Sequence, residues 1–103
     1  MKTTLNEELL YQIYSIVEEI PEGKVVTYKQ IAQLLGCDKN SRLIGKALKI
    51  SEFYGNYPCH RVVNSEGRLV PNWIEQKSLL LKEGVTFKSS GNVNLNISKW
   101  DYN

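Results

Sequence analysis

The segment from Pro58 to Val62 contains the residue types from which a nucleophilic site is built. It reads Pro-Cys-His-Arg-Val and includes His60, the only histidine of the chain. A cysteine attacks as its thiolate, which forms near neutral pH only beside a base or a positive charge. We therefore take Cys59 as the candidate nucleophile and His60 as its base. Neighbouring side chains of an extended chain point in opposite directions, so this pairing needs a turn, which Pro58 favours, or a bridging water.

The other cysteine, Cys37, does not suggest a second site. It follows Gly36, and we interpret it as a small residue of a turn. Neither a disulfide framework nor a zinc site is expected, because the two cysteines and His60 lack the ligand spacing of such sites. We expect no metal and no other cofactor.

Length and hydropathy exclude other classes. A chain of 103 residues is expected to form a single domain, residues 1–103, without internal repeats. No apolar run approaches the roughly 20 residues that span a bilayer, and the first residues do not read as a signal peptide. We therefore expect no membrane contact, and a location in the cytoplasm of a bacterium or in the cytoplasm or nucleus of a eukaryote.

The charges are unevenly distributed although the net charge is only +2. Residues 1–22 carry five glutamates and one lysine. Residues 36–51 carry four cations and a single aspartate. A basic stripe on a small domain indicates a polyanionic partner such as nucleic acid. On charge alone, a solvated helix face explains the stripe equally well.

Three helices are predicted before the Pro-Cys-His segment, over residues 4–20, 28–35 and 41–50. Thr4 and Thr27 stand where N-terminal caps are expected, and Gly36 stands where the second helix ends. The second and third helices, joined by a short turn, resemble a helix-turn-helix.

The predicted third helix has a basic and an apolar face. Arg42, Lys46 and Lys49 recur at helical spacing, opposite Leu43, Ile44, Ala47, Leu48 and Ile50. Gly45 lies inside this helix, where glycine costs about 1 kcal/mol relative to alanine. A glycine there indicates a close approach of the helix to the core or to a nucleic-acid backbone.

Three further elements are predicted beyond Val62: a hairpin of residues 62–63 with 68–70, a helix over 72–83, and a small β-element of 85–87 and 93–97. The turn Asn64-Ser65-Glu66-Gly67 supports the hairpin, and Gly84 supports the end of the helix.

Eight stretches carry a resemblance to a known family: Pro21–Tyr28, Ile31-Ala32, Gly36, Ser41–Leu48, Pro58–Val63, Gly67, Leu79-Leu80 and Glu83-Gly84. Together they resemble the DNA-binding domain of the O6-alkylguanine-DNA alkyltransferases, the methylated-DNA-protein-cysteine methyltransferases, over about residues 8–87. The resemblance implies a mainly α winged helix-turn-helix with small β elements and no metal. It also implies a recognition helix in the minor groove, flipping of O6-alkylguanine out of the duplex, and irreversible transfer of the alkyl group to the protein's own cysteine.

The resemblance also implies roles for individual residues. Cys59 would accept the alkyl group, His60 would relay its proton through a water, and Glu83 would orient His60. Tyr28 would pack at the flipped nucleotide and donate a hydrogen bond to the guanine, and Arg42 would fill the gap left in the duplex. From the residues alone, Tyr28 also suits the core, Arg42 a phosphate contact and Glu83 a surface cap.

Further contacts to substrate or DNA are expected from the same match, at Gly45, Lys46, Pro58, Arg61 and Val62. The backbone carbonyls of Cys59 and Val62 would accept hydrogen bonds from the guanine amino group. A flipped base must first leave its stack, which costs a few kcal/mol, and an inserted arginine offsets part of that cost.

Two departures from the family pattern stand out. Ser51 replaces an asparagine that braces the recognition helix. The loop that closes over the alkyl group is replaced by residues 68–73, and the segment between Gly67 and Glu83 is about three residues shorter. In these features the chain is similar to the alkyltransferase-like proteins, which bind alkylated guanine without repairing it and usually carry tryptophan in place of Cys59.

The function expected first is therefore DNA repair by a monomeric, single-turnover methyltransferase acting on double-stranded DNA that contains O6-alkylguanine. The alternative is a non-enzymatic alkyltransferase-like sensor that recruits nucleotide excision-repair proteins. A third interpretation is an ordinary winged-helix regulator in which Cys59 is incidental.

Overall fold

The computed structural model describes residues 6–36 and 41–101. In chain order the elements are α1 (Glu7–Glu19), β1 (Val26–Thr27), α2 (Tyr28–Leu34), α3 (Ser41–Lys49), the 3₁₀ turns η1 (Ser51–Phe53) and η2 (Cys59–Arg61), β2 (Val62–Val63), α4 (Glu75–Lys82) and α5 (Leu95–Ser98). The predicted cap Thr4 and the predicted turn around Cys37 lie outside the described residues.

Helix α1 forms much as its apolar spacing predicts. Its N-terminal cap is Asn6, whose side chain accepts a hydrogen bond from the Leu9 amide at 2.9 Å. The helix buries one stripe of residues: Leu10, Ile13, Tyr14, Ile16 and Val17. It ends before Pro21, in agreement with the expectation for the 21–23 turn.

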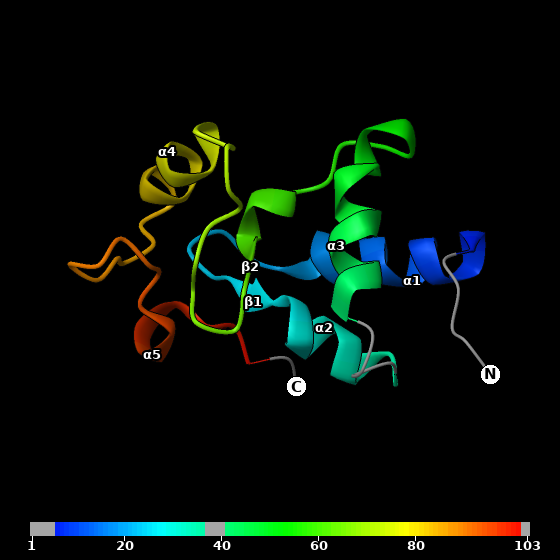
Figure 1. Cartoon of the computed structure of the whole chain (residues 1–103), viewed down its shortest axis with the longest axis horizontal. Helices are drawn as coiled ribbons and strands as arrows, with labels where there is room; N and C mark the ends of the chain where they lie inside the picture. Colours follow the sequence, from blue (N-terminus) through cyan, green and yellow to red (C-terminus); the bar gives the residue numbers. More distant parts are fainter. Residues whose placement is uncertain (1–5, 37–40, 102–103) are drawn as a thin grey trace.

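Helices α2 and α3 form the predicted pair and pack on each other and on α1 (Figure 1). Thr27 caps α2 in a reciprocal arrangement, since its hydroxyl accepts from the Gln30 amide and the Gln30 side chain accepts from the Thr27 amide. Gly36, with φ of +72°, follows the end of α2 in the left-handed conformation that glycine adopts without strain. In α3, Ile44 and Ala47 are buried, while Arg42, Lys46 and Lys49 are exposed.

The predicted hairpin is wrong. Val62-Val63 pairs instead with β1, in parallel, with Val26 opposite Val62 and Thr27 opposite Val63. The turn at Asn64 does form, because the Asn64 amide donates to the Arg68 carbonyl at 3.1 Å. No second strand forms over residues 68–70. The Val70 amide donates to the Gln76 side chain at 2.7 Å and is therefore not free to pair with Val62-Val63.

The C-terminal third also differs in part from the prediction. Helix α4 begins at Glu75 rather than at residue 72, because Asn72 has a φ of +69°, which an α-helix does not tolerate. The tail forms one bridge between Phe87 and Val93 and another between Lys99 and Val25, and α5 occupies most of the stretch predicted to be a strand.

Figure 1 shows α1, α2 and α3 on one side of the small sheet and α4 and α5 on the other. A hydrophobic core lies on each side: one is built mainly from α1, α2 and α3, and the other from Val25, Val63, Leu80, Val85 and Val93. The segment Pro58–Arg61 runs between the two halves, directly before β2. Within the described part of the chain, none of the helices combines the length and apolar character needed to traverse a bilayer.

Candidate functional site

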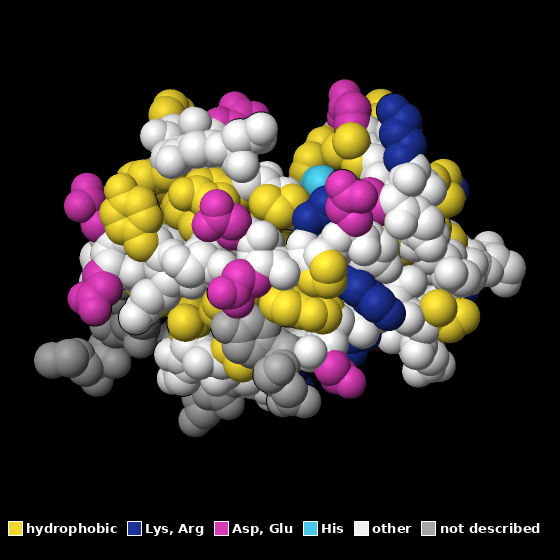
Figure 2. All heavy atoms as spheres, turned by 180° about the vertical axis from the view of Figure 1, so that it is seen from behind, with side chains coloured by type: hydrophobic (Ala, Val, Ile, Leu, Met, Phe, Trp, Pro, Cys, Tyr) yellow, Lys and Arg dark blue, Asp and Glu magenta, His cyan; other side chains and the backbone are white. Residues whose placement is uncertain are grey.

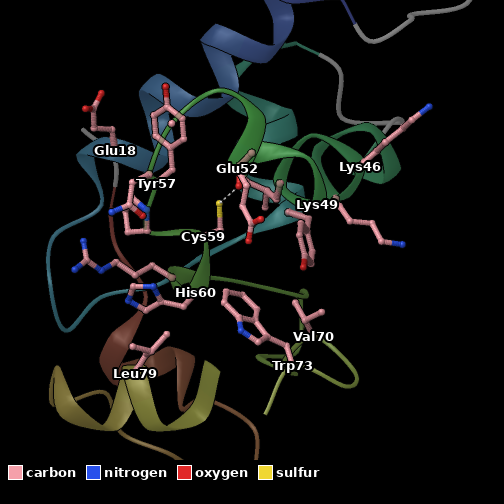
Figure 3. A pocket seen from close by; sticks show the side chains of 18 residues that line it. Glu18, Lys46, Lys49, Glu52, Tyr57, Cys59, His60, Val70, Trp73 and Leu79 are labelled. Carbon is pink, nitrogen blue, oxygen red and sulfur yellow. Dashed lines mark hydrogen bonds between the residues drawn. The ribbon is translucent and has the colours of Figure 1, made fainter. Parts of the chain in front are cut away.

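A cavity of about 1180 Å³ opens between α3 and η1 on one side and the segment from Val70 to Trp73 with α4 on the other (Figure 3). Figure 2 shows the molecule from behind, with the single histidine beside basic and acidic side chains below a hollow between two raised parts. The volume exceeds the roughly 300–1,000 Å³ of ordinary small-molecule pockets. The predicted site residues that line it are Tyr28, Gly45, Lys46, Pro58, Cys59, His60 and Arg61.

The other three predicted site residues lie outside the lining. Glu83 touches the cavity wall through His60, and Val62 is fully buried in β2 behind it. Arg42 is exposed on α3, one turn before Lys46. The structure thus brings seven of the predicted residues to one cavity and leaves Arg42 beside it.

Cys59 contacts a hydroxyl rather than an imidazole. Its Sγ lies 3.3 Å from the Oγ of Ser51, and the structure shows no direct hydrogen bond between Cys59 and His60. Burial raises the pKa of the Cys59 thiol, and the Ser51 hydroxyl offsets only part of that rise. The thiol is therefore protonated near neutral pH and is a poor nucleophile.

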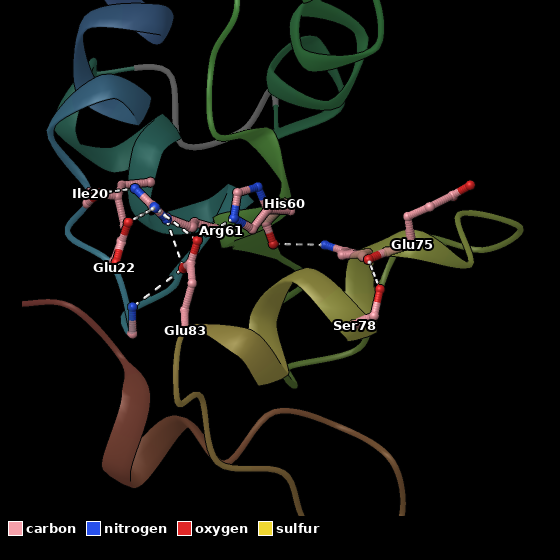
Figure 4. Close-up of polar contacts among 9 residues, drawn as sticks. Ile20, Glu22, His60, Arg61, Glu75, Ser78 and Glu83 are labelled. Carbon is pink, nitrogen blue, oxygen red and sulfur yellow. Dashed lines mark hydrogen bonds and ion pairs between the residues drawn. The ribbon is translucent and has the colours of Figure 1, made fainter.

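His60 and Arg61 both bind Glu83, the residue that ends α4 (Figure 4). The His60 Nε2 lies 2.7 Å from Glu83 Oε2, and Arg61 donates to both carboxylate oxygens at 2.9 and 2.8 Å. Arg61 also donates to the Ile20 carbonyl, and the Gly23 amide donates to Glu83. This network ties α4 and η2 to the turn after α1, and it occupies the Arg61 guanidinium.

The same network sets the ionisation of Glu83. Burial alone would raise its pKa, but hydrogen bonds from Arg61, His60 and Gly23 outweigh it and lower the pKa from 4.5 to about 2. Glu83 is therefore ionised at every physiological pH. The expected contact between Glu83 and His60 is present in the structure; the water relay from Cys59 stays a prediction.

Gln76 is a site residue that the sequence analysis missed. It is fully buried, and its amide donates to the carbonyls of His60 and Val62 at 3.1 and 3.2 Å while accepting from the Val70 amide. It thereby fastens the cavity wall at Val70 to the segment that carries Cys59. Nothing in the sequence singles out this glutamine, because its position on α4 also suits an exposed residue.

The backbone carbonyls of Cys59 and Val62, which were expected to accept hydrogen bonds from the guanine amino group, each already accept one hydrogen bond within the protein. That of Val62 accepts from Gln76, and that of Cys59 accepts from the Val62 amide. A carbonyl oxygen has a second lone pair, so each can still accept one further hydrogen bond.

Two tyrosines brace the cavity from behind. The ring of Tyr57, which lines the cavity, stacks on Tyr14 of α1 with centroids 4.6 Å apart. The Tyr14 hydroxyl donates to the Ala47 carbonyl in α3 at 2.6 Å, and burial raises the pKa of Tyr14 to about 12. Tyr14 therefore joins α3 to the loop that precedes Cys59, which the sequence pattern did not predict.

Gly45 faces the cavity and not the core. A Cβ placed there would meet no heavy atom within 4 Å. Close packing of α3 on the core therefore does not explain this glycine. Among the residues that the structure describes, no three His, Cys, Asp or Glu side chains gather closely enough to hold a metal ion.

Comparison with known proteins gives one consistent result. The model of the family described as "6-O-methylguanine DNA methyltransferase, DNA binding domain" matches residues 8–85. A DNA base-flipping protein of Escherichia coli (strain K12) is 37% identical over 94 residues, covering 88% of this chain and 73% of the relative. Alkyltransferase-like protein 1 of Schizosaccharomyces pombe is 36% identical over 101 residues, covering 91% and 94%.

The fold has a solved counterpart. The crystal structure of S. pombe Atl1 in complex with damaged DNA containing O6-carboxymethylguanine matches with a TM-score of 0.81 at 33% identity, covering 96% of this chain and all of that one. The predicted class, mainly helical with small β elements and a helix-turn-helix pair, is confirmed.

The expectation of a methyltransferase is wrong. Both relatives named above match most of this chain over most of their own length, and they are named for base flipping and for likeness to alkyltransferases. A methylated-DNA--protein-cysteine methyltransferase of Kluyveromyces lactis matches 77% of this chain but only 43% of its own length. In the structure the half-buried Cys59 thiol is bonded to Ser51, and burial raises its pKa.

Proposed function

Because the chain belongs to the family of the 6-O-methylguanine DNA methyltransferase DNA-binding domain, we propose that it is a non-enzymatic lesion sensor. It binds double-stranded DNA, turns an O6-alkylguanine out of the stack into the cavity beside Cys59, and holds it there. The observation that carries this proposal is the cavity itself, which adjoins the exposed cations of α3 and contains a thiol whose pKa is raised by burial.

Different residues around the cavity would contact the phosphates, the base stack and the flipped base. Lys46 and Lys49 are exposed on α3 and would bind backbone phosphates, which supply most of the affinity for any DNA. Arg42 would enter the stack in place of the lesion and offset part of the unstacking cost of a few kcal/mol. Tyr28 lines the cavity. Burial raises the pKa of its hydroxyl, and the nearby Cys59 raises it further, so the hydroxyl stays protonated and would donate to the flipped base.

Holding rather than repairing is supported by the partner of the thiol. The hydrogen bond of Cys59 goes to the Ser51 hydroxyl, while His60 is bonded to Glu83 and Arg61 to Glu83 and the Ile20 carbonyl. A sensor of this kind marks the lesion for other proteins, and nucleotide excision-repair proteins are the proposed partners. Residues 1–103 would act as a single domain and as a monomer, in the cytoplasm of a bacterium or the nucleus of a eukaryote.

The test combines binding with intact-protein mass spectrometry on matched duplexes with and without O6-methylguanine. We expect tighter binding to the damaged duplex and an unchanged protein mass after long incubation. Binding without preference for the lesion, or a mass increase equal to a transferred methyl group, would contradict the proposal. Tight binding to one undamaged sequence would instead support an ordinary winged-helix regulator.

Three variants locate the preference on α3. Arg42→Ala is expected to lose the preference for the damaged duplex, since the flipped state loses its stack-filling group. Lys46→Ala and Lys49→Ala are expected to weaken binding to both duplexes alike and to reduce the salt dependence by about one unit of slope each. Equal losses of affinity on both duplexes for Arg42→Ala would show that Arg42 does not fill the gap left by the flipped base.

A further inference from the structure

A second, smaller recess of about 150 Å³ adjoins the cavity. It is lined by Tyr28, Asn64, Arg68, Leu69, Val70 and Pro71. Tyr28 and Val70 also line the large cavity, so these two side chains form the partition between the two spaces. Figure 3 shows Val70 beside Trp73 at the large cavity.

The polar lining of the recess consists of hydrogen-bond donors. The carboxamide of Asn64 is oriented by its own loop, because its Oδ1 accepts from the amides of Glu66 and Arg68 at 2.9 and 2.7 Å. Two N–H donors on one atom identify that atom as the oxygen, so the NH₂ group is the end left for a ligand. The hydroxyl of Tyr28 stays protonated, because burial raises its pKa.

Arg68 contributes the charge of the recess. It is exposed, and no carboxylate lies among the residues that line the recess. Within the described ranges 6–36 and 41–101, Arg68 forms no ion pair, whereas Arg61 forms several. The residues that line the recess thus include a guanidinium, an amide NH₂ and a hydroxyl, and such a set of donors suits an anion with several oxygens.

The wing loop, residues 64–71, holds these donors in fixed positions. Its turn is closed between Asn64 and Arg68, and Gly67 packs against the tail, where the Val93 amide donates to the Gly67 carbonyl at 2.8 Å. A Cβ at Gly67 would lie 2.4 Å from the Val93 carbonyl oxygen, so only glycine fits. At its other end the loop is anchored by the bond from the Val70 amide to Gln76.

We propose that Arg68 and Asn64 form a phosphate site that binds one backbone phosphate of the strand whose base occupies the large cavity. The volume of the recess suits a phosphate group and not a base. Because the two spaces share Tyr28 and Val70 in their linings, a nucleotide with its base in the cavity would carry a flanking phosphate within reach of the recess. The inference rests on the proposed function and adds to it a contact from the wing loop.

The first experiment measures the salt dependence of binding for Arg68 variants. Arg68→Gln is expected to weaken binding to damaged and undamaged duplexes and to reduce the slope of log affinity against log salt by about one. Arg68→Lys should restore the slope, because the charge returns. Lys82→Gln is the matched control, since Lys82 is exposed on α4 and lines neither space. An unchanged slope for Arg68→Gln overturns the phosphate site.

The second experiment identifies the phosphate. Duplexes are made in which single phosphates around the lesion are replaced by uncharged methylphosphonates. The wild-type protein should lose affinity at one flanking position, and Arg68→Gln should show no further loss at that position while keeping the losses elsewhere. Additive losses at every position overturn the assignment. If the lesion preference of the wild type persists in that case, only the phosphate site fails; if the wild type shows no preference, the proposed function fails.

Discussion

At the residue scale, Cys59 shows that a nucleophile needs more than the right neighbour in the sequence. His60 follows it directly, yet the imidazole is bound to Glu83 and the thiol to Ser51. The Ser51 hydroxyl accepts a hydrogen bond from the thiol, but a hydroxyl is too weak a base to remove the thiol proton. The cysteine therefore acts as a small, weakly polar part of the cavity wall.

Cys59→Ala tests this view directly. We expect the variant to bind an O6-methylguanine duplex within a few-fold of wild type, because neither the cations of α3 nor the partition at Tyr28 is altered. Fluorescence anisotropy with damaged and undamaged duplexes measures it. A complete loss of lesion preference on removal of this one sulfur atom would show that the thiol contributes the main contact.

Glu83 predicts how the free energy of unfolding depends on pH. Its pKa is lower in the folded protein, about 2, than the ordinary 4.5, so its contribution is fully present above pH 4.5 and is lost as the pH falls toward 2. The contribution is on the order of 1–3 kcal/mol. Glu83→Gln should be destabilised at pH 7 and should lose the part of the pH dependence that lies between 4.5 and 2.

Urea unfolding at several pH values provides the measurement for Glu83. Glu75→Gln is the control, because Glu75 is exposed in the first turn of the same helix. Parallel pH profiles for the wild type and Glu83→Gln would show that the network with Arg61 and His60 does not stabilise the fold.

At the element scale, the main question is why α3 tolerates a glycine. The helix carries its cations on the exposed face, and a Cβ at Gly45 would project into open space at the cavity. The fold therefore gains nothing from this glycine. We infer that the missing side chain at Gly45 instead lets another molecule approach the helix closely from the cavity side.

Gly45→Ala should consequently change stability and binding in opposite directions. Alanine in a helix interior is favoured by about 1 kcal/mol over glycine, so the midpoint of thermal unfolding should rise. Affinity for duplex DNA should fall, because the added methyl group keeps the backbone from the helix. Thermal unfolding and duplex titration of the same preparation test both. Tighter or equal binding by Gly45→Ala would show that DNA does not approach the helix at this residue.

At the scale of the whole molecule, the cavity depends on how the two halves face each other. One wall comes from α3 and η1, and α3 contributes Ile44 and Ala47 to the first core. The other wall comes from Val70, Trp73 and α4, and α4 contributes Leu80 to the second core. The short segment 68–73 leaves this cavity open and large. Gln76 and the Glu83 network hold the halves together across β2.

The open cavity predicts a tolerance of large adducts. Duplexes with O6-methylguanine, O6-benzylguanine and a still larger O6-adduct should bind with dissociation constants within about tenfold of each other, a difference of 1.4 kcal/mol. Competition binding against one labelled duplex measures the series. A loss of affinity by several factors of ten from methyl to the larger adducts would show that the segment 68–73 closes on the base.

Most of the local structure could be predicted from the sequence. Helices α1, α2 and α3 follow from apolar residues at helical spacing, and Thr27 and Gly36 act as the predicted cap and stop. These features depend on neighbours within about one turn of the chain, and such signals are readable from the sequence. The candidates Cys59 and His60 were found from residue types in one short segment, whereas Gly45, Lys46, Pro58 and Arg61 were assigned to the site by the resemblance to a family.

What the tertiary structure decided are the contacts between distant residues. The hairpin was wrong because the Val70 amide binds Gln76, and β2 pairs instead with Val26-Thr27, which lies 36 residues earlier. The prediction of an enzyme took the adjacent His60 as the partner of Cys59, whereas the structure bonds the thiol to Ser51, eight residues away, and burial raises its pKa. A motif reports which groups are present; their protonation and partners are set by the packing around them, because burial and hydrogen bonding determine which form of a group is stable.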